Sequence, residues 1–151
     1  MIELARTSVN IDVSVSEVFR YVTNLERYGD WFPGVISVKS ANQNAHATVG
    51  KAYLETLRLP EGEMDIVIDV VKCQPDRLFM THGNLDGILP QMTMTFSPHQ
   101  DDRCQFTLQY HSRNPSLSET SDLVSALKTD ISNRAKMGVE RLKYQLETGC
   151  Y

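Results

Sequence analysis

The chain has 151 residues, of which 41% are hydrophobic and 23% are charged, and this size and composition predict one globular domain over residues 1–151. The net charge of −4, with lysine and arginine scattered singly, argues against a basic nucleic-acid-binding face. No apolar run reaches the roughly 18 residues of a membrane span, and the N-terminus does not resemble a secretory signal.

A strand followed by a capped helix is expected at the start of the chain. Residues 8–13 alternate polar and apolar side chains, which is the period of a half-buried strand. Ser14, with Glu17 three residues later, has the spacing of a capping box. Apolar residues then recur at helical spacing as far as Leu25. Gly29 is expected to end this region, after a second short helical turn at residues 24–28.

The segment YGDWFPGV, residues 28–35, combines large aromatic side chains with residues that form turns. Aromatic side chains on a loop need burial, either at the edge of the core or at the mouth of a pocket. We therefore expect Trp31 and Phe32 to lie beside a pocket mouth or to cap the core. The sequence alone leaves both arrangements open.

From residue 34 to residue 113 the hydrophobic period changes to two. Residues 63–71, 91–97 and 104–111 alternate most clearly, and turn sequences separate the alternating runs. This pattern predicts five or six further antiparallel strands with one covered and one solvated face. The positions expected to face inward are Met64, Ile66, Met80, Met92, Met94, Phe106, Leu108 and Tyr110.

The last segment, residues 117–147, has apolar residues at steps of three and four. It predicts a helix of about 30 residues, roughly 45 Å long, which Leu123, Leu127, Ile131 and Leu142 pack onto the sheet. Gly138 on the same stripe is expected to leave room beneath the helix. The predicted fold is therefore α+β, with a curved antiparallel sheet of six or seven strands wrapped around one long C-terminal helix.

This order of elements, together with the sequence of residues 9–38, resembles the START-like (SRPBCC) helix-grip superfamily and its polyketide cyclase/dehydrase-like proteins. VERLKYQLE, residues 139–147, resembles the end of the long helix of that superfamily. LERYGDWFPGV, residues 25–35, is also similar to the coenzyme Q-binding branch. The resemblance implies a cavity between sheet and helix, which members use to hold lipids, sterols, quinones, polyketides or plant hormones, and some use to close rings. It supplies no shared catalytic motif.

Histidines and cysteines give little support for metal chemistry. His46 and His99 lie in polar loops, and His111 lies on the solvated face of its strand. His82 shares the parity of Met80, so it is expected to point inward, where it could bind a ligand or be a paired core residue. A solvated position at the end of its strand stays open as well. No HxH or HxxxH pair occurs, and the three cysteines have no CxxC spacing. We expect no metal, no cofactor and reduced thiols in a cytoplasmic protein.

Catalytic motifs are not evident either. GxSxG, P-loop and GxGxxG patterns do not occur, so no catalytic residue is predicted. Glu55 lies in a strand with apolar residues at both parities, and the sequence does not say which face it occupies.

The sequence therefore predicts binding or transport of a small hydrophobic ligand, such as a lipid, quinone or polyketide, in an internal cavity. Two alternatives stay open: a polyketide cyclase/dehydrase-like enzyme that uses the same cavity, and a protein-interaction module without a ligand. The residues expected to contact the ligand are Trp31, Phe32, Met64, Ile66, Met80, His82, Met92, Met94, Phe106, Leu108, Tyr110, Leu127 and Ile131.

Overall fold

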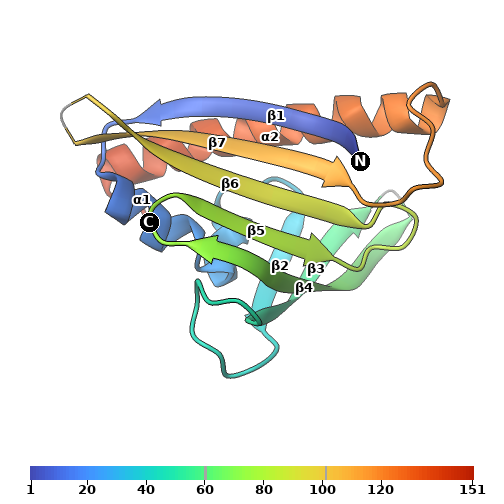
Figure 1. Ribbon diagram of the computed structural model, residues 1–151, viewed down its shortest axis with the longest axis horizontal. Helices are drawn as coiled ribbons and strands as arrows, with labels where there is room; N and C mark the ends of the chain where they lie inside the picture. The colour runs from blue at the N-terminus through green and yellow to red at the C-terminus, as the bar shows by residue number, and fades with distance from the viewer. Residues whose placement is uncertain (60, 101) are drawn as a thin grey trace.

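The computed structural model describes residues 1–59, 61–100 and 102–151. Seven antiparallel strands form one curved sheet in the order β1-β7-β6-β5-β4-β3-β2 (Figure 1). The strands are β1 (Ile2–Ile11), β2 (Val35–Ser40), β3 (Ala52–Leu59), β4 (Gly62–Gln74), β5 (Leu78–Gly83), β6 (Pro90–His99) and β7 (Arg103–Ser112). The helices are α1 (Val15–Val22), the 3-10 helix η1 (Leu25–Asp30) and α2 (Asp122–Thr148). The predicted α+β architecture, a curved antiparallel sheet with a long C-terminal helix, is confirmed.

The first strand and its helix follow the local sequence signals with one difference. β1 begins at Ile2, earlier than the predicted start at Ser8. Leu4 and Ala5 are both buried at a β-bulge, which breaks the alternation that would have indicated this part of the strand. At the end of β1, the Ser14 side chain accepts a hydrogen bond of 3.3 Å from the backbone N–H of Glu17 and caps α1. The predicted helix start is therefore confirmed.

Helix α2 lies along β1 (Figure 1) and begins later than the hydrophobic spacing predicted. Ser121 is its N-cap, because its side chain accepts a hydrogen bond of 3.2 Å from the backbone N–H of Val124. Val124 is fully buried, whereas Leu123 is 60% exposed. The prediction that Leu123 packs onto the sheet is wrong, because its neighbour takes the inward position. Leu127 and Ile131 are partly buried against the core.

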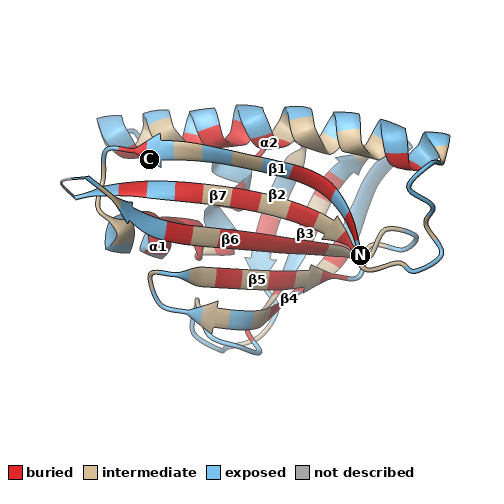
Figure 2. Cartoon of the chain, turned by 45° about the horizontal axis from the view of Figure 1, so that its top comes forward, coloured by how far each residue is buried: buried red, intermediate tan, exposed pale blue. Residues whose placement is uncertain are grey.

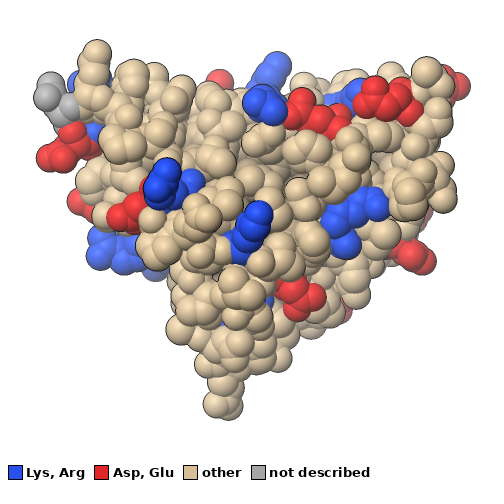
Figure 3. Space-filling model, viewed as in Figure 1, with Lys and Arg blue, Asp and Glu red and all other residues tan. Residues whose placement is uncertain are grey.

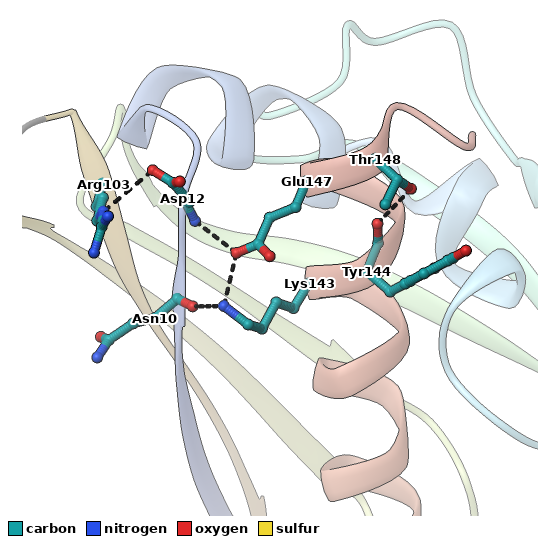
Figure 4. A network of polar contacts seen from close by, with 7 residues as sticks. All are labelled: Asn10, Asp12, Arg103, Lys143, Tyr144, Glu147 and Thr148. Atoms are coloured by element: carbon teal, nitrogen blue, oxygen red, sulfur yellow. Dashed lines mark hydrogen bonds and ion pairs between the residues drawn. The ribbon is translucent and has the colours of Figure 1, made fainter.

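Polar contacts fasten the C-terminal end of α2 to the end of β1 (Figure 4). Lys143 donates to the backbone oxygen of Asn10 at 2.6 Å and pairs with Glu147 at 2.7 Å. Glu147 also accepts the backbone N–H of Asp12 at 2.9 Å. Arg103 of β7 reaches the Asp12 carboxylate at 3.1 Å. The network fixes the position of this end of α2 on the sheet.

Aromatic side chains fill the core beneath that part of the helix. Phe96 lies 5.1 Å from Phe19 and 5.4 Å from Phe106, and Phe106 lies 6.3 Å from Trp31, measured between ring centroids. A Cβ atom added at Gly138 would lie 3.2 Å from Phe32 and 3.4 Å from the Trp31 backbone oxygen. The expected room beneath Gly138 is therefore filled by the loop after η1. Buried and less buried residues alternate along β5 and β7, whereas residues 91–94 of β6 are all buried (Figure 2).

Charged side chains of both signs lie on the surface. On the face drawn in Figure 3, basic and acidic side chains are interspersed among uncharged ones. Within residues 1–59, 61–100 and 102–151, none of the helices has the length and apolar character needed to cross a membrane.

Candidate ligand-binding site

A mostly apolar cavity of about 130 Å³ opens between the sheet and the N-terminal half of α2. Its floor is the inner face of strands β2 to β7, and its sides are η1 with the following loop and the loop between β5 and β6. Asp130, Ile131 and Arg134 of α2 complete the lining. The cavity therefore lies where the helix no longer sits on the aromatic core.

Five residues expected from the sequence to contact a ligand line this cavity. They are Phe32, Ile66, Met92, Tyr110 and Ile131. Ile66 and Tyr110 face inward in strands whose burial alternates there, and Met92 faces inward because it pairs with Tyr110. Their contact with a ligand stays a prediction.

Five others lie in the core outside the cavity lining. Trp31, Met94, Phe106 and Leu108 are fully buried, and Leu127 is partly buried against the core. Trp31 thus caps the core, whereas Phe32, the next residue, forms part of the cavity wall. The loop after η1 serves both roles that the sequence left open.

The inward orientation expected for Met80 and His82 is wrong, whereas Met64 shares the inner face of Ile66 but is exposed. In β5 the buried residues are Phe79, Thr81 and Gly83, and Met80 and His82 point to the outer face. Thr81 pairs with the buried Val70 of β4, and Phe79 pairs with the buried Met94 of β6, so this parity of β5 faces inward.

His82 instead lies opposite Gln91 on the outer face, and its Nε2 is 2.9 Å from the Gln91 side-chain oxygen. Met64 is 42% exposed, because it lies at the start of β4, beyond the region that the helix covers. None of these three residues lines the cavity in the described part of the chain.

Glu55 is the functional candidate that sequence reasoning missed. It lies on the inner face of β3, opposite Val38 of β2 and Ile66 of β4, and all three residues line the cavity. Its side chain is only 9% exposed. Burial raises the pKa of this carboxyl to about 7. No residue of the described chain forms a hydrogen bond or ion pair with its carboxylate.

Two tyrosines place hydroxyl groups in the same cavity. The hydroxyl groups of Tyr28 and Tyr110 hydrogen-bond one another, and both rings are buried. Burial, together with the charge of Glu55, raises the pKa of both phenols. In a flat sheet β3 and β7 would lie roughly 19 Å apart, at about 4.8 Å per strand. The curvature of the sheet brings the carboxylate and the phenols around one space.

Charged residues lie at the rim. Arg134 pairs with Asp130 at 3.2 Å, one turn apart on α2. The guanidinium of Arg134 rests against Gly34, where an added Cβ would lie 2.3 Å from Nη1, and Gly34 has a φ of +88°. Glycine is favoured at such a backbone angle, and here it also leaves space for the guanidinium.

His46 is not the free loop residue that the sequence suggested. Its Nδ1 is 2.5 Å from the hydroxyl of Tyr53, and its Nε2 is 3.2 Å from the Glu26 carboxylate. These contacts tie the loop between β2 and β3 to η1. In the described residues no group of three or more histidine, cysteine or acidic side chains is placed to hold a metal ion.

A family model described as "Polyketide cyclase / dehydrase and lipid transport" matches residues 4–147. The chain belongs to this family. The predicted membership among polyketide cyclase/dehydrase-like proteins is therefore confirmed, and a START superfamily protein shares the fold. A comparison with curated proteins found no significant match.

Solved structures share the fold at low sequence identity. A START superfamily protein from Mycobacterium smegmatis superposes with a TM-score of 0.70 at 14% identity, over 94% of this chain and 97% of that one. A protein from Thermus thermophilus has a TM-score of 0.72 at 12% identity, over 97% and 99% of the two chains. The di-domain ARO/CYC StfQ of the steffimycin biosynthetic pathway has a TM-score of 0.70 at 14% identity, over 92% of this chain and 48% of that chain. This chain thus spans about half of StfQ.

Proposed function

We propose that the protein binds a small hydrophobic ligand in the cavity beneath α2, with the polar end of the ligand at Glu55 and the Tyr28–Tyr110 pair. The observation that carries this proposal is a mostly apolar cavity into which one buried carboxylate projects, without a partner among the described residues. Ligand sites typically combine apolar walls with a few such polar groups that fix orientation. Membership in a family whose description includes lipid transport supports the same function.

The size of the cavity limits the ligand. A volume of about 130 Å³ is close to the roughly 150 Å³ of an apolar cavity that holds benzene. One ring or a short alkyl branch therefore fits, and the rest of a longer lipid, quinone or polyketide would leave through the rim at Arg134. This argues against folding a long polyketide chain inside the cavity.

The free cysteines Cys73, Cys104 and Cys150 also favour our expectation of a cytoplasmic location.

Two methionines on adjacent strands provide a matched test. Met92 lines the cavity, whereas Met80 lies on the outer face of the sheet. We expect para-ethylphenol, a one-ring probe with a hydroxyl group, to bind with one-to-one stoichiometry by calorimetry. Met92→Trp should abolish binding by filling the space, and Met80→Trp should leave it unchanged.

Binding that survives Met92→Trp, or that both variants weaken equally, would contradict a site in this cavity. Native mass spectrometry of protein purified without detergent complements the titration. It should show a bound hydrophobic molecule in the unaltered protein and a lower occupancy in Met92→Trp.

A further inference from the structure

We propose that Glu55 and the Tyr28–Tyr110 pair form a proton-transfer centre that converts a one-ring ketone to its enolate and back. The inference rests on the proposed function, because the ketone would occupy the same cavity. It adds a reaction and a substrate class to a binding site. Three features of the cavity carry it. Among the described residues one carboxylate has no partner and one hydroxyl proton has no acceptor, and the volume admits one ring.

The carboxylate is placed to act as a base. Glu55 faces the cavity between the apolar side chains of Val38 and Ile66. Buried ionisable groups are usually paired, because an unpaired buried charge is costly. No described residue pairs with Glu55, so its oxygen lone pairs are available to a bound molecule. A base whose pKa is about 7 is also matched to proton transfer near neutral pH.

The tyrosine pair supplies the complementary donor. In a hydrogen bond between two hydroxyl groups, one hydroxyl donates its proton and the other accepts. The proton of the accepting hydroxyl is then free, and in the described chain neither Tyr28 nor Tyr110 has another hydrogen-bond partner. That proton can be donated to a ligand oxygen inside the cavity. A fixed donor at the position where negative charge develops stabilises an enolate.

The chemical step needs no cofactor. The Glu55 carboxylate takes a proton from the carbon beside the carbonyl, and the C–H electron pair forms a carbon–carbon double bond. The carbonyl π electrons move to oxygen, which accepts the hydrogen bond from the tyrosine hydroxyl. The Glu55 carboxylic acid then returns its proton to the same carbon, or to the far end of a conjugated system. Atoms and charge balance over the cycle.

The charged surroundings set a pH profile. The titratable or charged groups that line the cavity with Glu55 are Tyr28 from η1, Tyr110 from β7, and Asp130 and Arg134 from α2. Strands β2, β4, β5 and β6 contribute only uncharged lining residues. The rate should rise with pH as Glu55 ionises near 7 and then reach a plateau. Both phenols stay protonated across that range, because burial raises their pKa values above the ordinary value of 10.0.

Hydrogen–deuterium exchange of phenylacetone in D₂O tests the reaction. This ketone carries one ring, and proton NMR follows the loss of its benzylic CH₂ signal. We expect the protein to accelerate exchange above a buffer blank, and Glu55→Gln to lower the protein-dependent rate by about 100-fold or more. Tyr110→Phe should lower it by at least about tenfold. Glu63→Gln is the matched control, because Glu63 is an exposed carboxylate on the same hairpin, and it should leave the rate unchanged.

Displacement of para-ethylphenol by phenylacetone, measured in the same samples, separates the two proposals. Displacement without Glu55-dependent exchange would overturn the proton-transfer centre and leave ligand binding in place. Failure of phenylacetone to displace bound para-ethylphenol would overturn the ketone class alone. Failure of both compounds to bind would overturn both proposals. The pH profile of the unaltered protein is independent of whether any variant folds, and an exchange rate that is flat from about pH 5.5 to 8.5 would also overturn the inference.

Discussion

Tyr28 and Tyr110 hydrogen-bond one another through their side-chain hydroxyl groups although they are 82 residues apart in the chain. Tyr28 belongs to η1 and Tyr110 to β7, so the contact joins the segment before the aromatic loop to the inner face of the sheet. Both residues line the cavity. The pair therefore contributes to the fold and to the candidate site at once.

Removing both hydroxyl groups of this pair should lower the free energy of unfolding by less than the sum of the two single removals. Tyr28→Phe and Tyr110→Phe each leave a buried hydroxyl without its partner, which costs about 1–3 kcal/mol. The double variant loses both polar groups, so its destabilisation should fall short of the sum by about 1 kcal/mol. Urea unfolding of the four proteins measures this coupling free energy. Strict additivity would mean that the hydrogen bond contributes nothing to stability.

Glu55 should make the free energy of unfolding depend on pH. Burial raises its pKa from 4.5 to about 7, so the native state binds more protons than the unfolded state between these values. Stability from this group is complete below about pH 4.5 and falls as the pH rises through 7. Glu55→Gln should therefore raise the free energy of unfolding by about 3 kcal/mol at pH 8 and hardly at all at pH 4.

Urea titrations at the two pH values measure this difference. The exposed Glu63→Gln should show no pH-dependent gain. An equal gain for Glu55→Gln at both pH values would mean that the effect is not one of ionisation.

The sequence could predict the architecture because its periodicity agrees with the tertiary contacts. Alternation in β4, β6 and β7 places Ile66, Met92 and Tyr110 on the inner face, where they are found. The capping pattern at Ser14 likewise corresponds to a real helix start. These signals are local, and each is set by a few neighbouring residues.

The candidate site depends on features that are not local. In β5, apolar residues occupy both parities, and only the pairing with β4 and β6 places Phe79 inward and Met80 outward. In β3, apolar residues also occupy both parities, so the sequence does not show which face Glu55 occupies. Its pairing with Val38 and Ile66 places it on the inner face. A buried carboxylate also contradicts the ordinary preference of its residue type. The face on which the Glu55 side chain lies can be predicted only once the strand register is known.

Cysteine alkylation should follow burial and thiol pKa. Cys150 is exposed, whereas Cys104 is fully buried and its pKa is raised to about 11 by that burial. The thiolate is the reactive form, so iodoacetamide at pH 8 should modify Cys150 first. Cys73 is half-buried with a raised pKa and should react next. Peptide mass spectrometry over time gives the order, and modification of Cys104 before Cys73 in folded protein would contradict the burial of Cys104.

The rim of the cavity should open when Gly34 is replaced by alanine. The added Cβ would lie 2.3 Å from the Arg134 guanidinium, so this flexible side chain must move away from the mouth. The φ of +88° at Gly34 adds a backbone cost of about 1 kcal/mol. Ligand entry should become faster, while the cavity walls deeper inside stay unchanged. Stopped-flow fluorescence of Trp31, the only tryptophan, can follow the association of para-ethylphenol.

Gly149→Ala provides the matched control for this experiment. Gly149 has a φ of +71° with no atom within 4 Å of an added Cβ, and it lies at the C-cap of α2. It should therefore lose similar stability without any change in the association rate. Arg134→Ala should accelerate entry as Gly34→Ala does, because both changes remove the guanidinium from the rim. If Gly34→Ala slows entry or matches the Gly149 control, Arg134 does not limit access to the cavity.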